Sequence, residues 1–132
     1  MSSADLKANR PLSPHIQIYH WHLTMAMSIA HRITGVALYF GTILLAWWLI
    51  AAASGAEYFS FVNRLAGSWV GLIVLFGYSW ALIHHALGGI RHFIWDTGRG
   101  LGRPARDNLA LANIVGSVGL TIVLWIIGLL VW

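Results

Sequence analysis

The stretch Trp69–Trp95 reads WVGLIVLFGYSWALIHHALGGIRHFIW and is almost free of charge. It has no acidic residue, and Arg91 is its only lysine or arginine. Its length exceeds the roughly 20 apolar residues that a helix needs to cross a hydrocarbon core. Because lipid cannot satisfy free backbone groups, a segment of this kind crosses the membrane as a helix. The stretch therefore predicts a transmembrane helix.

Two further apolar segments, residues 24–53 and 109–132, have the same character. Of the 132 residues, 58% are hydrophobic and only 9% are charged, which excludes a soluble globular domain. The 8 Trp, 5 Phe and 4 Tyr residues exclude a disordered chain. We predict an all-α membrane protein with a polar N-terminal segment, residues 1–23, and a three-helix transmembrane domain, residues 24–132. The expected spans are about 24–53, 69–95 and 109–132.

The basic residues predict the orientation of these spans. Seven of the eight gather at one membrane face, before the first span, at its start, and at and after the end of the second: Lys7, Arg10, Arg32, Arg91, Arg99, Arg103 and Arg106. The positive-inside rule then predicts a cytoplasmic N-terminus and an external C-terminus. A formal charge of +4 distributed in this way does not indicate nucleic-acid binding. The loop Ser54–Gly67, which is rich in aromatic residues, is expected to lie in the opposite membrane interface.

The second span contains His84, His85 and His92, with Gly88 and Gly89 between them. On a helix, His85, both glycines and His92 share one face, because they are three, four and seven residues apart. This arrangement lets a flat ligand lie against the backbone while an imidazole reaches its centre, as a haem iron requires. It also suits plain helix packing, in which the glycines allow close approach, and spacing alone leaves both interpretations open. His84 lies about 100° around the helix from His85 and is expected to face another helix or a polar pocket.

The first span carries a second polar stripe, formed by Ser28, His31, Arg32 and Gly35 at the same spacing. One interpretation is that Arg32 extends to the cytoplasmic lipid headgroups. The other is that the hydroxyl, imidazole and guanidinium form a site for an anion or a carbonyl, such as a haem propionate or a quinone oxygen. This stripe and Arg91 are expected at the same membrane depth, which favours a site.

Small and polar residues elsewhere are expected to serve helix packing. In the third span, Asn113, Ser117 and Thr121 recur every four residues. Interhelical contacts in membranes favour residues of this kind. Gly67 and Gly71 have the small-xxx-small spacing and are expected to make a helix contact of the same type.

Three motifs follow one another along the chain: RPLSPH at 10–15, SIAHRITG at 28–35, and HALGGIRH at 85–92 with WDTG at 95–98. Together they resemble the cytochrome b556 membrane-anchor family of succinate dehydrogenase (complex II), and the resemblance covers nearly the whole chain. The first motif is most similar to the mitochondrial and alphaproteobacterial branch.

The resemblance implies a heterotetramer in which a flavoprotein subunit and an iron–sulfur subunit stand on two membrane anchors. The three spans would then form part of a helix bundle with a second anchor subunit, surrounded by membrane lipid. Succinate oxidation would belong to the flavoprotein, so no catalytic residue is expected in this chain. The absence of cysteine agrees with iron–sulfur clusters that lie in another subunit.

The family also implies cofactor and substrate sites. A haem b would lie between the two anchors, with His85 as the axial iron ligand from this chain and one histidine from the partner. The remaining residues assigned to the haem site are His31, Arg32, Gly88, Gly89 and Arg91. Ubiquinone would be reduced at a pocket that uses Ser28 and Arg32, with Arg32 stabilising the negative charge that develops on the quinone oxygen.

We therefore expect a multi-pass anchor of succinate dehydrogenase in a bacterial inner membrane. The lack of an obvious transit peptide makes the mitochondrial inner membrane the less favoured location. The alternatives are the anchor of a quinol:fumarate reductase, a homo-oligomeric b-type cytochrome in which His85 of two copies face each other, and a scaffold or small transporter whose stripes serve packing alone.

Overall fold

The computed structural model describes residues 18–131, which form four α-helices. These are α2 (Leu23–Ser54), α3 (Ala56–Ala66), α4 (Trp69–Asp96) and α5 (Arg103–Val131). The helices α2, α4 and α5 are long and apolar enough to cross a membrane. No strand occurs between residues 18 and 131. The predicted all-α membrane fold with three apolar spanning helices is confirmed.

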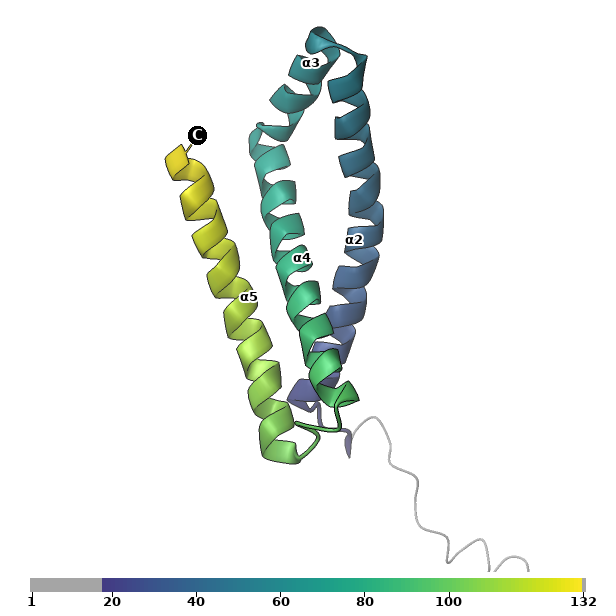
Figure 1. The fold of residues 1–132 in the computed structure, drawn as a ribbon, viewed down its shortest axis with the longest axis vertical. Helices are drawn as coiled ribbons and strands as arrows, with labels where there is room; N and C mark the ends of the chain where they lie inside the picture. Colours follow the sequence, from purple (N-terminus) through teal and green to yellow (C-terminus); the bar gives the residue numbers. More distant parts are fainter. Residues whose placement is uncertain (1–17, 132) are drawn as a thin grey trace, which may run out of the picture.

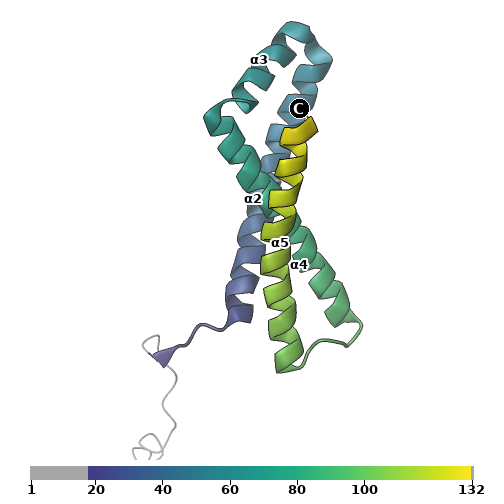
Figure 2. The ribbon, with the colours of Figure 1, turned by 90° about the vertical axis from the view of Figure 1, so that its left-hand side faces the viewer.

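The three long helices alternate in direction, and α4 packs against both α2 and α5 (Figure 1). The start of α2 and the connection between α4 and α5 lie at one end of the bundle. The short helix α3 lies at the other end, toward which the end of α5 points (Figure 2). Arg32, Arg91 and the basic residues of the α4–α5 connection are therefore near the same end, as predicted for them. Lys7 and Arg10, the other members of the predicted basic group, lie outside the described residues.

Residues between the helices explain where each helix begins and ends. Gly55 separates α2 from α3 with a φ of +126°, a conformation that favours glycine over residues with a side chain. Ser68 begins α4 as its N-cap, and its hydroxyl accepts a hydrogen bond from the backbone N–H of Gly71 at 3.2 Å. Pro104 lies in the first turn of α5, where the N–H that proline lacks has no helical partner anyway.

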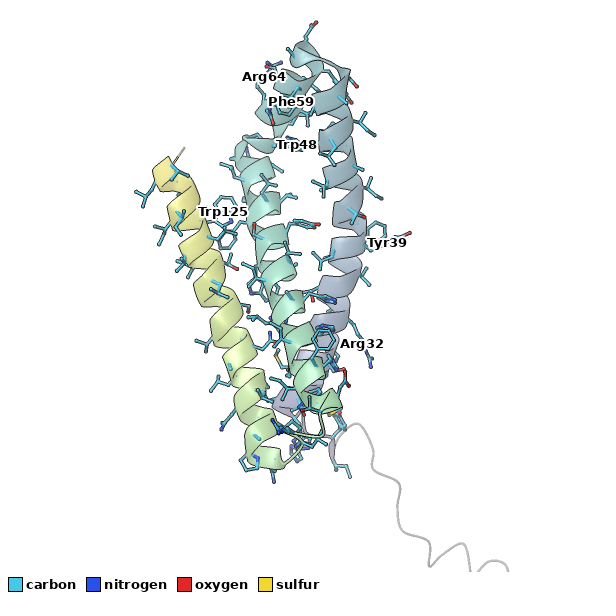
Figure 3. The ribbon with its side chains drawn as sticks, viewed as in Figure 1. Arg32, Tyr39, Trp48, Phe59, Arg64 and Trp125 are labelled. Carbon is cyan, nitrogen blue, oxygen red and sulfur yellow. The ribbon has the colours of Figure 1, made fainter. Side chains whose placement is uncertain are left out.

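Two connections differ from the sequence prediction. The third long helix begins at Arg103 instead of 109, because the polar residues before the apolar span continue the helix. The segment expected to be an interfacial loop is largely the helix α3. One face of α3 packs back on α2: the Trp48 indole N–H donates to Asn63 Oδ1 at 3.0 Å, and its ring lies 5.5 Å from that of Phe59 (Figure 3). Val62, on the same side, is buried.

The interior of the bundle is made of small and polar side chains, and the exterior is apolar. The buried residues are Met27, Thr34, Gly41, Ala51, Val62, Ala81, His84, Gly88, Arg91, Ala110, Asn113, Ser117 and Thr121. Large apolar side chains are exposed along all three long helices. This arrangement is typical of membrane bundles, in which close packing and interhelical hydrogen bonds hold the helices together.

Gly67 and Gly71 do not make the helix contact that their spacing predicted. Gly67 ends α3, and Gly71 lies in the first turn of α4. A Cβ at Gly71 would overlap the backbone carbonyls of Leu65 and Ala66 at the end of α3. The absence of a side chain at Gly71 thus allows the tight turn between α3 and α4.

Replacement of Gly71 should therefore open this turn. We expect Gly71→Ala to lower the free energy of unfolding of the detergent-solubilised protein by about 1–3 kcal/mol. The added methyl group would overlap the backbone at the end of α3, which could make room only if α3 moved. The measurement is thermal unfolding followed by circular dichroism. Gly77→Ala on the same helix is the control, since a Cβ there has no neighbour within 4 Å. Equal melting temperatures for the two variants would contradict the prediction.

Candidate functional site

His85 lies on the side of α4 that packs against α2, and its Nδ1 atom has two oxygen partners there. The backbone carbonyl oxygen of His31 is 3.1 Å away, and the hydroxyl oxygen of Thr34 is 3.3 Å away. The Nε2 atom makes no hydrogen bond with any residue between 18 and 131. One nitrogen of His85 is thus held by α2, and the other is left for a ligand.

The two polar stripes predicted on the first and second spans meet at this point. The rings of His31 and His85 are stacked, with centroids 3.9 Å apart and an interplanar angle of 14°. His92 approaches from the next turns of α4, with its ring centroid 5.4 Å from that of His31. Three imidazoles from two helices therefore lie along the contact between α2 and α4.

The two glycines beside His85 have different surroundings. Gly88 is buried, and a Cβ on it would overlap the His31 ring. Gly89 has no atom within 4 Å of the position that its Cβ would occupy. The space at Gly88 is therefore filled by His31, whereas the surface at Gly89 is open.

Arg91 is a buried cation without a hydrogen-bonding partner in the described part of the chain. Its side chain is 4% exposed, and its Nε and Nη1 atoms are buried and unpaired. The guanidinium lies 5.0 Å from the centre of the Trp95 ring, which gives it a cation–π contact. A buried charge is costly unless it is paired, so Arg91 is well suited to bind an anion.

Ser28 and Arg32 do not join the histidine cluster through hydrogen bonds. Ser28 is half-buried, and Arg32 is exposed at the edge of the bundle (Figure 3). Neither makes a side-chain hydrogen bond or ion pair with another residue in the range 18–131. They lie one turn apart on α2, near the end that carries the basic residues.

His84 faces α5, as its position on the helix predicted. It is 2% exposed, and its Nδ1 atom lies 3.2 Å from both Ser117 Oγ and Asn113 Nδ2. The Asn113 amide also reaches the backbone carbonyl oxygen of His84 at 3.3 Å. Thr121 is buried on the same face of α5. The polar stripe of the third span therefore serves packing against α4.

Thr34 was not identified from the sequence as a site residue. It is 2% exposed and contacts His85 Nδ1 through its hydroxyl group. Its position three residues after His31 placed it on the polar face of the first span, but a threonine in an apolar helix is common. Only the packing of α2 on α4 distinguishes it from other threonines.

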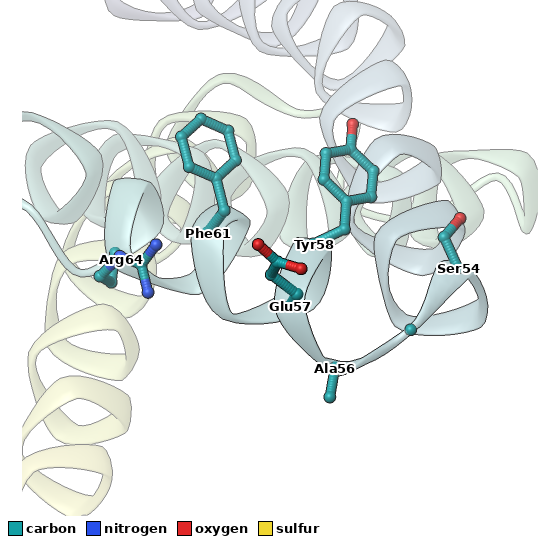
Figure 4. Close-up of a pocket in the computed structure, with 7 residues that line it drawn as sticks. Ser54, Ala56, Glu57, Tyr58, Phe61 and Arg64 are labelled. Carbon is teal, nitrogen blue, oxygen red and sulfur yellow. The ribbon is translucent and has the colours of Figure 1, made fainter.

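Two depressions in the described chain lie away from the histidines. A depression of about 530 Å³ occurs at the junction of α2 and α3 (Figure 4), and it is lined by Ser54, Gly55, Ala56, Glu57, Tyr58, Phe61 and Arg64. An apolar groove of about 360 Å³ runs between α2 and α4, beside Gly41 and Tyr78. Neither depression is lined by a histidine, and the candidate site described above lies on the surface around His85.

Comparison with known proteins relates the chain to membrane subunits of respiratory enzymes. The sequence profile of the succinate dehydrogenase/fumarate reductase transmembrane subunit family matches residues 7–127. The succinate dehydrogenase cytochrome b556 subunit of Paracoccus denitrificans is 42% identical over 121 residues, which cover 92% of this chain and 93% of the relative. That of Rickettsia felis is 39% identical over 122 residues, with coverage of 92% and 95%. The mitochondrial cytochrome b560 subunit of Bos taurus is 44% identical over 124 residues, with coverage of 89% and 73%.

The polar contacts of His84 should contribute measurably to the packing of α4 on α5. We expect Asn113→Ala to lower the free energy of unfolding of the detergent-solubilised protein by about 1–3 kcal/mol, because it removes a hydrogen-bond partner from the buried His84 imidazole. Asn108→Ala, at an exposed position on the same helix, is the control for loss of an amide. Thermal unfolding followed by circular dichroism compares the two variants. If Asn113→Ala and the control have the same melting temperature, the contacts of His84 do not stabilise the protein.

Proposed function

We propose that this chain, which belongs to the succinate dehydrogenase/fumarate reductase transmembrane subunit family, provides one haem b ligand and part of the ubiquinone-reduction site of a succinate dehydrogenase. The observation that carries the proposal is the state of His85. Its Nδ1 atom is held by α2, while its Nε2 atom has no partner in the described chain. This is the arrangement expected of a histidine that binds a metal through Nε2.

The residues around His85 fit a haem. His85 would supply one histidine ligand to the iron, and the second would come from the second anchor subunit. Its carboxylates need cationic or N–H partners, and Arg91 and the buried Nε2 atom of His31 lack partners in the range 18–131. The exposed guanidinium of Arg32 would assist them. When bound, the haem supplies one-electron transfer.

Gly89 and Gly88 contribute by their lack of side chains. Gly89 leaves the surface of α4 open one turn beyond His85, where a flat ligand can lie against the helix. Gly88 admits the His31 ring, which packs on His85. The role of Gly88 would thus be to support the histidine ligand through His31.

Ser28 and Arg32 would bind the quinone. Their side chains are free of hydrogen bonds within the described chain and lie near the end of α2 from which electrons would arrive. The Ser28 hydroxyl can donate a hydrogen bond to a quinone carbonyl oxygen. The Arg32 guanidinium would stabilise the negative charge that develops on that oxygen during reduction. This chain would thus orient the quinone and lower the free-energy cost of placing negative charge on its oxygen.

The partners follow from the same assignment. The flavoprotein and iron–sulfur subunits would cover the end of the bundle that carries the basic residues, on the cytoplasmic side. The exposed apolar faces of the long helices would contact lipid and the second anchor. The relatives from Paracoccus and Rickettsia support a bacterial inner membrane.

The two adjacent histidines should differ in their effect on haem. We expect His85→Ala to remove the b-type bands from the reduced-minus-oxidised spectrum of the complex, purified through a tag on this chain. His84→Asn is the matched control, because an amide can still bond to α5, and it should keep those bands. Full haem content in His85→Ala would contradict the ligand assignment. A stable, haem-loaded protein purified without the other subunits would favour the homo-oligomeric cytochrome.

The quinone assignment predicts a loss of ubiquinone reduction that is separate from the loss of haem. We expect Ser28→Ala and Arg32→Ala to lower the rate of succinate-dependent ubiquinone reduction at least about tenfold, because each removes a group that stabilises the charged quinone oxygen. Succinate oxidation with an artificial acceptor that bypasses the quinone should stay unchanged. Arg64→Ala, at the opposite end of the bundle, is the control for loss of an arginine. Normal ubiquinone reduction in Ser28→Ala and Arg32→Ala would overturn the assignment.

A further inference from the structure

We propose that Thr34 is a positioning residue that, with the backbone carbonyl of His31, fixes the tautomer and raises the basicity of His85. This inference rests on the proposed role of His85 as a haem ligand. The Thr34 hydroxyl makes no hydrogen bond with Ser28 or Arg32, the residues proposed to bind quinone. Its effect would act through the imidazole alone.

The hydroxyl group of Thr34 is held in one orientation by its own helix. Its oxygen lies 2.9 Å from the carbonyl oxygen of Ala30 and 3.0 Å from that of His31. The hydroxyl proton is therefore donated to one of these two carbonyls. A lone pair of the same oxygen is left to face His85 Nδ1, 3.3 Å away. Because Thr34 is 2% exposed, little solvent competes for this contact.

These oxygens determine which nitrogen of His85 carries the proton. A carbonyl oxygen only accepts hydrogen bonds, so Nδ1 must be the donor to His31. The other neutral tautomer would point a nitrogen lone pair at a carbonyl lone pair. With the proton on Nδ1, the lone pair of Nε2 is free to bind a metal. A second acceptor on Nδ1–H draws the proton outward and makes Nε2 a stronger donor to iron.

The position of the ring is restricted by two further contacts with α2. A Cβ on Gly35 would lie 3.0 Å from His85 Cε1, so the imidazole rests almost directly on this glycine. One face of the ring is stacked on His31. Rotation of the imidazole away from Thr34 would break both contacts. The distance from Nδ1 to the hydroxyl is thus a property of the packed pair of helices.

The test is Thr34→Val in the complete complex, which removes the hydroxyl and keeps the branched shape. We expect haem affinity to fall about tenfold, the lower end of the range for loss of an outer partner of a metal ligand. We also expect the haem midpoint potential to rise, since a less basic ligand stabilises oxidised iron less. Thr34→Ser keeps the hydroxyl and should restore both values. Thr42→Val, at an exposed position on the same helix, should change neither.

The outcomes separate this inference from the proposed function. If His85→Ala loses haem while Thr34→Val keeps the wild-type potential and affinity, Thr34 has no positioning role and the ligand assignment stands. If His85→Ala keeps its haem, the ligand assignment itself fails. Should the valine variant not assemble, Thr34→Ala gives the same comparison with a smaller side chain. A wild-type potential in that variant would equally overturn the inference.

Discussion

The contact between the His85 imidazole and α2 is the interaction on which the rest of the site depends. Apolar side chains gain little from meeting each other in a membrane, because lipid tails are equally apolar. Helices α2 and α4 are therefore held together where polar atoms and small residues meet. The Nδ1 atom of His85, the carbonyl of His31 and the hydroxyl of Thr34 form such a point. The same contacts that pack α2 on α4 therefore also fix the orientation of the His85 imidazole.

Two adjacent histidines of α4 contact two different helices. His84 and His85 differ by about 100° around α4, which is enough to send one imidazole toward α5 and the other toward α2. His84 bonds to Asn113 and Ser117 and is buried. His85 is left half-buried, with one nitrogen unpaired within the described chain. The structural histidine fixes α4 against α5 and so sets the rotation of α4 that presents His85 to α2.

The sequence predicted those features that depend on a single helix. Hydropathy identified the three long helices, and the angle between neighbours predicted that His84 faces another helix or a polar pocket. The sequence did not predict α3, because an aromatic-rich connection is equally typical of an interfacial loop. The hydrogen bond between Trp48 and Asn63, which holds α3 on α2, is visible only in the structure. The sequence also did not predict that His31 fills the space at Gly88, or that Thr34 reaches His85. Both depend on the register between two helices, which periodicity within one helix does not specify.

The two oxygens that hold His85 Nδ1, and the His31 ring stacked on the imidazole, belong to α2 of the same chain. A metal ligand oriented by a neighbouring subunit would acquire its geometry only when that subunit docks. Here the oxygens come from α2, which is synthesised before α4. The imidazole can be aligned as soon as the hairpin of α2 and α4 has inserted into the bilayer. Under the proposed haem role, this chain's half of the site would then form before association with the second anchor supplies the other half.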